Sequence, residues 1–176
     1  MIRGLLIAVS LLAQASPAGP AAEPRPSCRA SDFSIAVGFA ISAATGQNPL
    51  TLRLTNRGPN ACVLFGYPTI SLADRRGAIP FAIRRGGDQM VTARPPTPVL
   101  VRARGSAFVV LNKYRCDRGV RRLARTLRLG FPRDTSSRLS LALASYPRLG
   151  YCGKGDAGST VATSPFEPSL RAALRR

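Results

Sequence analysis

The 176-residue sequence contains no histidine and no tryptophan, and it has only two lysines and eight carboxylates. The absence of histidine excludes Ser-His-Asp and Cys-His catalysis, and it removes the usual general base near neutral pH. The four cysteines include no C-x-x-C pair, so the residues for a zinc site are also missing. We therefore expect no catalytic residue, no metal and no cofactor, and we interpret the protein as non-enzymatic.

The few carboxylates are scattered along the chain. Asp74, Asp88 and Asp117 lie in predicted turns, where an aspartate ordinarily accepts hydrogen bonds from its own backbone. Separation in sequence does not fix separation in space, so a carboxylate pair for glycoside hydrolysis stays open as an alternative. A hydrolase of this undetected type is the least favoured of three hypotheses.

Residues 1–15 have the pattern of a signal peptide. A short positive start precedes an apolar run of ten residues, and Ala13-Gln14-Ala15 forms a small-x-small cleavage site. The apolar run is about half the length needed to span a bilayer. Cleavage as late as residue 22 is the alternative, and a Pro/Ala-rich linker follows over residues 16–27. These features predict an exported protein, secreted or extracytoplasmic, that is soluble after removal of the leader and has no transmembrane segment.

Short alternating apolar segments dominate the rest of the chain. Leu50, Leu52 and Leu54 alternate with polar residues, so one face of that segment is apolar, and turn residues follow at 56–60. Similar segments recur at spacings of about 8–12 residues, which predicts a single antiparallel β-sandwich of about eight strands, an all-β fold. We place this domain at residues 28–168. The expected strands are 33–41, 50–55, 61–73 with a bulge at 66–68, 79–83, 99–101, 107–111, 127–131, 139–143 and 159–163.

An arginine-rich segment is the candidate binding site. Its arginines alternate with apolar residues at a spacing that a short helix could use, so we expect a helical turn or loop before Thr126. Guanidinium groups gathered on one surface can hold phosphates or carboxylates in pairs, whereas the alternative is an ordinary solvated face. The candidate anion-binding residues are Arg118, Arg121, Arg122, Arg125 and Arg128. After the domain, residues 169–176 form a basic tail that we expect to fray.

The charge of the chain is extreme. The formal net charge is +18, and removing the leader with Arg3 lowers it to +17. Such an excess indicates an anionic partner, such as an envelope polymer, a phospholipid headgroup or an acidic protein. Nucleic acid is disfavoured because aromatic residues for stacking are few and export separates the protein from it. The alternative is a high-GC coding sequence, which enriches Arg, Ala, Gly and Pro together.

The central stretch carries a pattern that resembles a known family. The pattern is Leu54-Thr55-Asn56-x-Gly58, Cys62-x-Leu64-x-Gly66-Tyr67-Pro68-x-Ile70-x-Leu72 and Asp74-x-x-Gly77. It resembles the secreted domain-of-unknown-function 4232 family, found mainly in actinobacteria, and continues to Cys116, Cys152 and Ser164-Pro165-Phe166. The resemblance implies an immunoglobulin-like sandwich outside the cytoplasm and no known activity. Many members carry a lipid-anchored cysteine or a membrane segment, whereas Cys28 here follows Arg25-Pro26-Ser27, which is no lipid-attachment motif.

Four cysteines in an exported domain predict two disulfides, for which three pairings exist. The resemblance favours Cys28 with Cys62 and Cys116 with Cys152. The rival Cys62–Cys116 bridge would be the inter-sheet bridge of antibody domains, but the tryptophan that accompanies it is absent.

The favoured hypothesis is a non-enzymatic exported module that binds an anionic cell-envelope or extracellular partner. The second is a structural or assembly domain that docks onto another envelope protein through strand edges and apolar loops. The two differ in salt sensitivity, because charge-driven binding weakens on screening.

Overall fold

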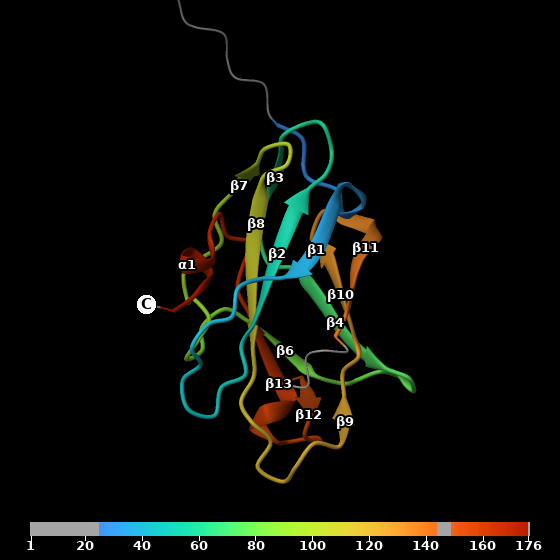
Figure 1. Ribbon diagram of the computed structural model, residues 1–176, viewed down its shortest axis with the longest axis vertical. Coiled ribbons are helices and arrows are strands. Elements are labelled where there is room, and N and C mark those ends of the chain that lie inside the picture. The colour runs from blue at the N-terminus through green and yellow to red at the C-terminus, as the bar shows by residue number, and fades with distance from the viewer. Residues whose placement is uncertain (1–24, 144–148, 176) are drawn as a thin grey trace, which may run out of the picture.

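The computed structural model describes residues 25–143 and 149–175, and the predicted signal peptide lies outside them. Two larger sheets and two short strand pairs make up the fold (Figure 1). The five-stranded sheet has the order β1 (Phe33–Val37), β2 (Leu50–Asn56), β8 (Ser106–Asn112), β13 (Thr160–Thr163), β6 (Ala82–Arg85). The four-stranded sheet has the order β11 (Asp134–Ala142), β10 (Thr126–Phe131), β4 (Thr69–Asp74), β5 (Gly77–Ala78).

The two short pairs lie at opposite ends of the long axis (Figure 1). They are β3 (Cys62–Leu64) with β7 (Val99–Val101), and β9 (Arg122–Leu123) with β12 (Gly150–Tyr151). Helical structure in the described residues is limited to two 3-10 turns, Ala30–Asp32 and Ala157–Ser159, and the short helix α1 (Leu170–Ala173). No described helix is long and apolar enough to cross a membrane.

The core lies between the two larger sheets. Leu52 and Leu54 of β2 and Leu127 and Leu129 of β10 are each fully buried in one apolar cluster. The alternation of apolar and polar residues therefore sets which side chains face the partner sheet. The predictions of an all-β sandwich and of both disulfides, Cys28–Cys62 and Cys116–Cys152, are confirmed.

A buried aspartate fastens the first turn of the domain to the four-stranded sheet. Asp134, 7% exposed, accepts hydrogen bonds from the backbone N–H of Ala30 at 2.8 Å and from the hydroxyls of Ser136 and Ser137. The hydroxyls of Ser137 and Ser136, and then the Ala30 amide, hold the pKa of Asp134 well below its usual range.

The first strand is shorter than predicted. It ends at Val37 instead of residue 41, and Phe39 is 68% exposed. Because Val37 pairs with Leu52, a longer β1 would run past the start of β2 to Pro49, which has no N–H to donate. Beyond Val37 the Thr51 hydroxyl donates a hydrogen bond to the Phe39 carbonyl at 2.6 Å, in place of a continued strand pairing.

The strand predicted at 79–83 begins later than expected, because Pro80 divides the segment and β6 covers only Ala82–Arg85. Ile79 still donates to the Leu72 carbonyl at 2.8 Å, but β6 then joins the other sheet. There β6 runs parallel to β13, so the sandwich is not purely antiparallel. Pro80 has no N–H to donate, so pairing with the first sheet ends there and the chain crosses to the other sheet.

The segment before Thr126, where we expect a helical turn or loop, is a loop that contains the short strand β9. Gly119 has φ +84°, which is not a helical conformation. The backbone of β9 forms its hydrogen bonds with β12 and not within a helical turn.

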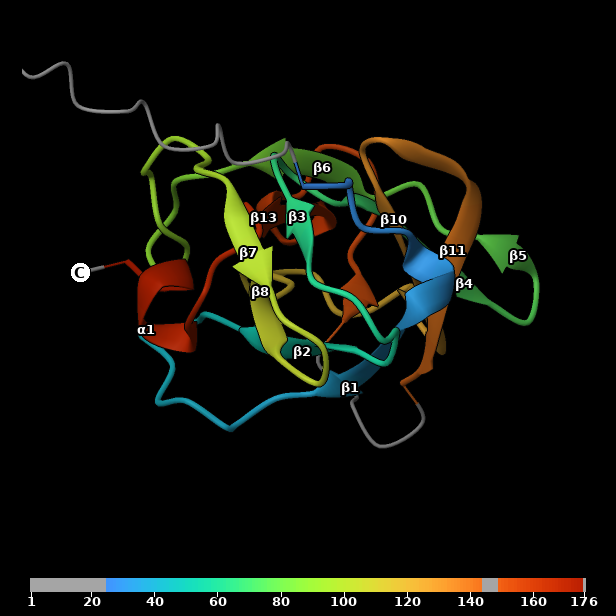
Figure 2. The ribbon, with the colours of Figure 1, turned by 90° about the horizontal axis from the view of Figure 1, so that it is seen from above.

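The C-terminal segment is docked and not frayed, unlike our expectation. The Ser169 hydroxyl accepts the Ala172 N–H at 3.2 Å at the start of α1, which packs beside β8 (Figure 2). Ala173 is fully buried, and its apolar neighbours in this small cluster are Val91, Val110, Ala162, Leu170 and Leu174.

Candidate anion-binding site

The arginine loop, residues 117–125, is held at both ends. The Cys116–Cys152 disulfide precedes it, and its backbone pairs with the segment around β12. The Arg121 N–H donates to the Tyr151 carbonyl at 2.8 Å, and the Ala124 N–H donates to the Leu149 carbonyl at 3.0 Å. These bonds fix the backbone from which the arginine side chains extend.

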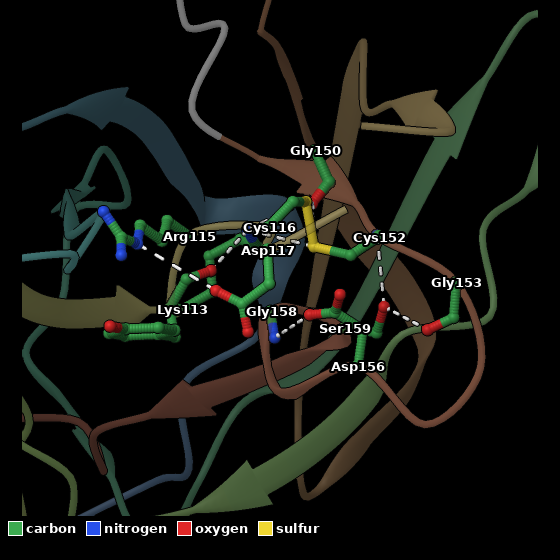
Figure 3. The surroundings of a disulfide bond; sticks show 11 residues. Lys113, Arg115, Cys116, Asp117, Gly150, Cys152, Gly153, Asp156, Gly158 and Ser159 are labelled. Carbon is green, nitrogen blue, oxygen red and sulfur yellow. Dashed lines mark hydrogen bonds and ion pairs between the residues drawn. A yellow bond between two sulfur atoms is a disulfide. The ribbon is translucent and has the colours of Figure 1, made fainter. Parts of the chain in front are cut away.

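A buried lysine supports the disulfide (Figure 3). The Lys113 ammonium donates to the Tyr114 carbonyl at 2.6 Å and lies 3.8 Å from the Cys152 sulfur and 4.0 Å from the Cys116 sulfur. Lys113 is 3% exposed, and burial lowers its pKa, an effect that nearby Asp156 opposes. We interpret this ammonium as part of the scaffold under the loop.

The loop that returns from Cys152 is closed by one serine. The Ser159 hydroxyl donates to the Gly153 carbonyl at 2.6 Å and accepts the Cys152 N–H at 3.1 Å (Figure 3). Gly158 packs against the disulfide so closely that a Cβ there would lie 2.5 Å from the Cys152 sulfur. Any side chain at this position would clash with the disulfide, so the position requires glycine.

Arg122 joins the arginine loop to the β4–β5 turn. Its Nε and Nη2 donate to the two carboxylate oxygens of Asp74 at 2.8 and 2.6 Å. The same guanidinium donates to the carbonyls of Gly77 and Ala78 at 3.2 and 3.1 Å. With its donors engaged by protein oxygens, Arg122 positions the loop.

The Arg122 guanidinium also lowers the pKa of Asp74 from 3.8 to about 2, and the carboxylate raises that of Arg122. Hydrogen bonding to the ionised form is the main cause. Asp74 therefore stays ionised across the neutral range, and the ion pair persists with it.

Four further arginines surround this pair. Together with Asp74, Arg122 and Leu123 they line a hollow of about 250 Å³, which we call the arginine hollow. Its four exposed arginines are Arg75, Arg76, Arg121 and Arg125. Within the described part of the chain none of these four makes an ion pair. The hollow thus concentrates positive charge that the described residues leave uncompensated.

A second hollow, of about 450 Å³, lies against the Gly-rich loop 152–157. It is lined by Arg118 and Arg121 but also by Asp117 and Asp156. Arg121 lines both hollows, and a Cβ at Gly153 would lie 3.0 Å from its Nε. The two carboxylates offset part of the positive charge of Arg118, Arg121 and Lys154, whereas the first hollow has Asp74 as its one carboxylate.

The structure therefore divides the five predicted arginines. Arg121, Arg122 and Arg125 line one hollow, and Arg118 lines only the second hollow, which it shares with Arg121. Arg128 stands on β10 opposite Ser71 of β4 and Ser140 of β11, away from both hollows. Sequence reasoning missed Arg75 and Arg76, although their place in the Asp74–Gly77 turn was visible.

The exposed side chains of the arginine hollow are donors suited to anions. Guanidinium groups bind phosphate or carboxylate in bidentate pairs and stay charged at all relevant pH. The described residues contain no cluster of three or more metal-ligating side chains. The one carboxylate among its lining residues, Asp74, accepts hydrogen bonds from Arg122 through both oxygens.

Fold and surface together define a class: a small β-sandwich held by two disulfides, with a basic hollow at one end. The chain belongs to the family described as Domain of unknown function (DUF4232), which matches residues 28–167 and confirms the family resemblance. No curated protein and no solved structure matches the chain.

The Asp74–Arg122 pair gives a test of the site's scaffold. The folded-state pKa of Asp74, about 2, lies below the ordinary 3.8, so its contribution to stability is present above about pH 4 and lost as the pH falls toward 2. We expect the native protein to lose stability steeply in this window and Asp74→Asn to lose less. Urea unfolding at several pH values measures this. Asp32→Asn, at an exposed residue, is the control, and an acid response of Asp74→Asn identical to the native one contradicts the assignment.

Proposed function

We propose that this protein is an exported, non-enzymatic module that binds an anionic polymer of the cell envelope or extracellular space. The arginine hollow is its contact surface. The proposal rests on one observation: four exposed arginines from two separate segments line the same concave surface. They are Arg75, Arg76, Arg121 and Arg125.

Electrostatics favours an anionic occupant for this hollow. Like charges gathered on a concave surface repel one another and raise the local concentration of counterions. The Arg122–Asp74 pair, with its 2.6 Å contact, fixes the two segments before any ligand arrives. Such preorganisation reduces the entropy lost on binding.

Export is supported by the leader pattern in residues 1–15 and by the two disulfides. Disulfides form and persist in oxidising compartments, including secreted and periplasmic ones. An envelope or extracellular polymer with repeated phosphates or carboxylates therefore suits both the location and the charge.

The test compares two sets of arginines with equal change of charge. The first variant carries Arg→Gln at Arg75, Arg76, Arg121 and Arg125. The control carries Arg→Gln at four exposed arginines on or beside β1, β2 and β7, which make no side-chain hydrogen bond in the described structure: Arg29, Arg53, Arg57 and Arg102.

Binding to long-chain polyphosphate and to polygalacturonate is measured across a salt series. We expect the hollow variant to lose about tenfold or more in affinity near physiological salt and to show a smaller salt slope, with the control changing much less. An equal loss of affinity in both variants would show that binding depends on the total charge of the protein and not on the hollow. Binding to anionic phospholipid vesicles but to neither polymer would overturn the choice of partner.

One observation favours the second candidate, a structural or assembly domain. Phe65 and Leu100 are 41% and 42% exposed, and both lie on or beside the β3–β7 pair. Exposed apolar side chains of this size suit a protein partner. A stoichiometric envelope protein that remains bound at high salt and is lost in Leu100→Ser would favour this candidate.

A further inference from the structure

A second site is built at a polar cavity that shares no residue with the arginine hollow. The cavity, of about 430 Å³, lies among the β1–β2 loop, the β6–β7 loop, the end of β8 and the C-terminal segment. Its volume is within the range of small-molecule sites. The residues that matter are Gln47, Arg84, Asp88, Gln89, Asn112 and Arg175, and we call it the amide cavity.

A row of hydrogen-bonded side chains forms the wall of the amide cavity. The Gln47 Nε2 donates to Gln89 Oε1 at 3.1 Å, and the Asn112 Nδ2 donates to Gln47 Oε1 at 2.5 Å and to Asp88 Oδ2 at 2.6 Å. Asp88 is held in turn by the backbone N–H groups of Met90 and Val91, each at 2.7 Å. Side chains from three separate segments are thus fixed before a ligand binds.

Asn112 has an unfilled hydrogen-bonding group. Its side chain is fully buried, and Asp88 determines its orientation, because exchanging Nδ2 and Oδ1 would set two oxygens against each other. No described residue donates a hydrogen bond to Oδ1. A buried acceptor left unpaired costs about 1–3 kcal/mol, so such groups are ordinarily satisfied.

Positive charge and an aromatic ring complete the cavity. Arg84 and Arg175 line it and are exposed, and Arg175 donates to the Asp88 carbonyl at 3.0 Å. Tyr114 also lines it, and its ring packs on Gly46 so closely that a Cβ there would lie 2.6 Å away. Gly46 has φ +75°, so the ring's position depends on that glycine.

We propose that the amide cavity binds a small polyhydroxylated anion the size of one sugar acid. Hydroxyl groups both donate and accept, which matches a wall of amides and a carboxylate. The two arginines match the acid group, and Tyr114 adds an aromatic side chain to the lining. This inference rests on its own residues and does not depend on the arginine hollow.

The test uses glucuronate as the probe, with glucose and inorganic phosphate as comparison compounds. Titration of the isotope-labelled oxidised protein is followed by NMR through the side-chain amide signals of Asn112 and Gln47. We expect saturable shifts of these signals with glucuronate at millimolar concentrations and much weaker effects from glucose and from phosphate. The readout reports the cavity directly, so its failure is distinct from failure of polymer binding.

Matched variants separate the site from general charge. Arg84→Gln with Arg175→Gln should weaken glucuronate binding by about tenfold. Arg85→Gln with Arg171→Gln should not, although Arg85 adjoins Arg84 on β6 and Arg171 lies on α1, because neither residue lines the cavity. No saturable shift, equal loss in both variants, or equal binding of phosphate and glucuronate would each overturn the proposal.

Discussion

Replacing Cys28 and Cys62 together by serine is expected to lower the free energy of unfolding by about 3–4 kcal/mol. The bridge joins residues 34 apart, and opening it frees that loop in the unfolded chain. The loss is a large share of the roughly 5–15 kcal/mol that typically separates folded from unfolded domains.

The structure adds a local reason for this effect. The bridge holds the start of the domain beside β3, where the Cys28 N–H donates to the Val63 carbonyl at 3.1 Å and the Val63 N–H donates to the Pro26 carbonyl at 2.9 Å. Both cysteines are buried, at 3% and 8% exposure. Urea unfolding of the oxidised native protein and of the double variant measures the change. A loss below about 1 kcal/mol, the size of an average substitution, would contradict this role.

Replacing Cys116 and Cys152 together by serine is expected to cost a similar free energy, about 3–4 kcal/mol, and also to weaken anion binding. This bridge joins residues 36 apart, nearly the same separation as the first. It differs in position, because it anchors the arginine loop next to Lys113 and β12 (Figure 3).

The two double variants are controls for each other. Their loops are of nearly equal length, and their bridges adjoin the two strand pairs at opposite ends of the molecule (Figure 1). At a temperature where both variants are folded, polyphosphate affinity should fall about tenfold in the Cys116/Cys152 variant and stay near native in the Cys28/Cys62 variant. Equal affinities would show that the disulfide does not position the arginines.

Much of the fold follows from local pattern. The alternation at Leu50, Leu52 and Leu54 predicts a strand with one buried face, and each of these side chains is buried. The predictions that are wrong concern residues whose partners are distant. The end of β1 depends on Pro49 across the sheet, and the sheet change at Pro80 depends on the edge that β13 offers.

In the arginine loop, too, the structure depends on partners that are distant in the sequence. Its spacing allowed a helical turn as well as a loop, and pairing with β12 and the nearby disulfide favour the loop. The sequence indicated Arg121 and Arg125 as candidates. Their position next to Arg75 and Arg76 depends on the pairing of β4 with β10, which the sequence does not show. The positioning role of Arg122 follows only from its bonds to Asp74. The amide cavity has no sequence signal, because its residues come from segments far apart in the chain.

The most direct test of the central claim is NMR of the arginine Nε–Hε signals during titration with short-chain polyphosphate at near-physiological salt. The account predicts saturable shifts at Arg75, Arg76, Arg121 and Arg125, while Arg29, Arg53, Arg57 and Arg102 change little. Arg122 should respond weakly, since its Nε already donates to Asp74 at 2.8 Å. Shifts of similar size spread over all the exposed arginines, without saturation, would contradict the account and leave the charge of this chain as a general surface property.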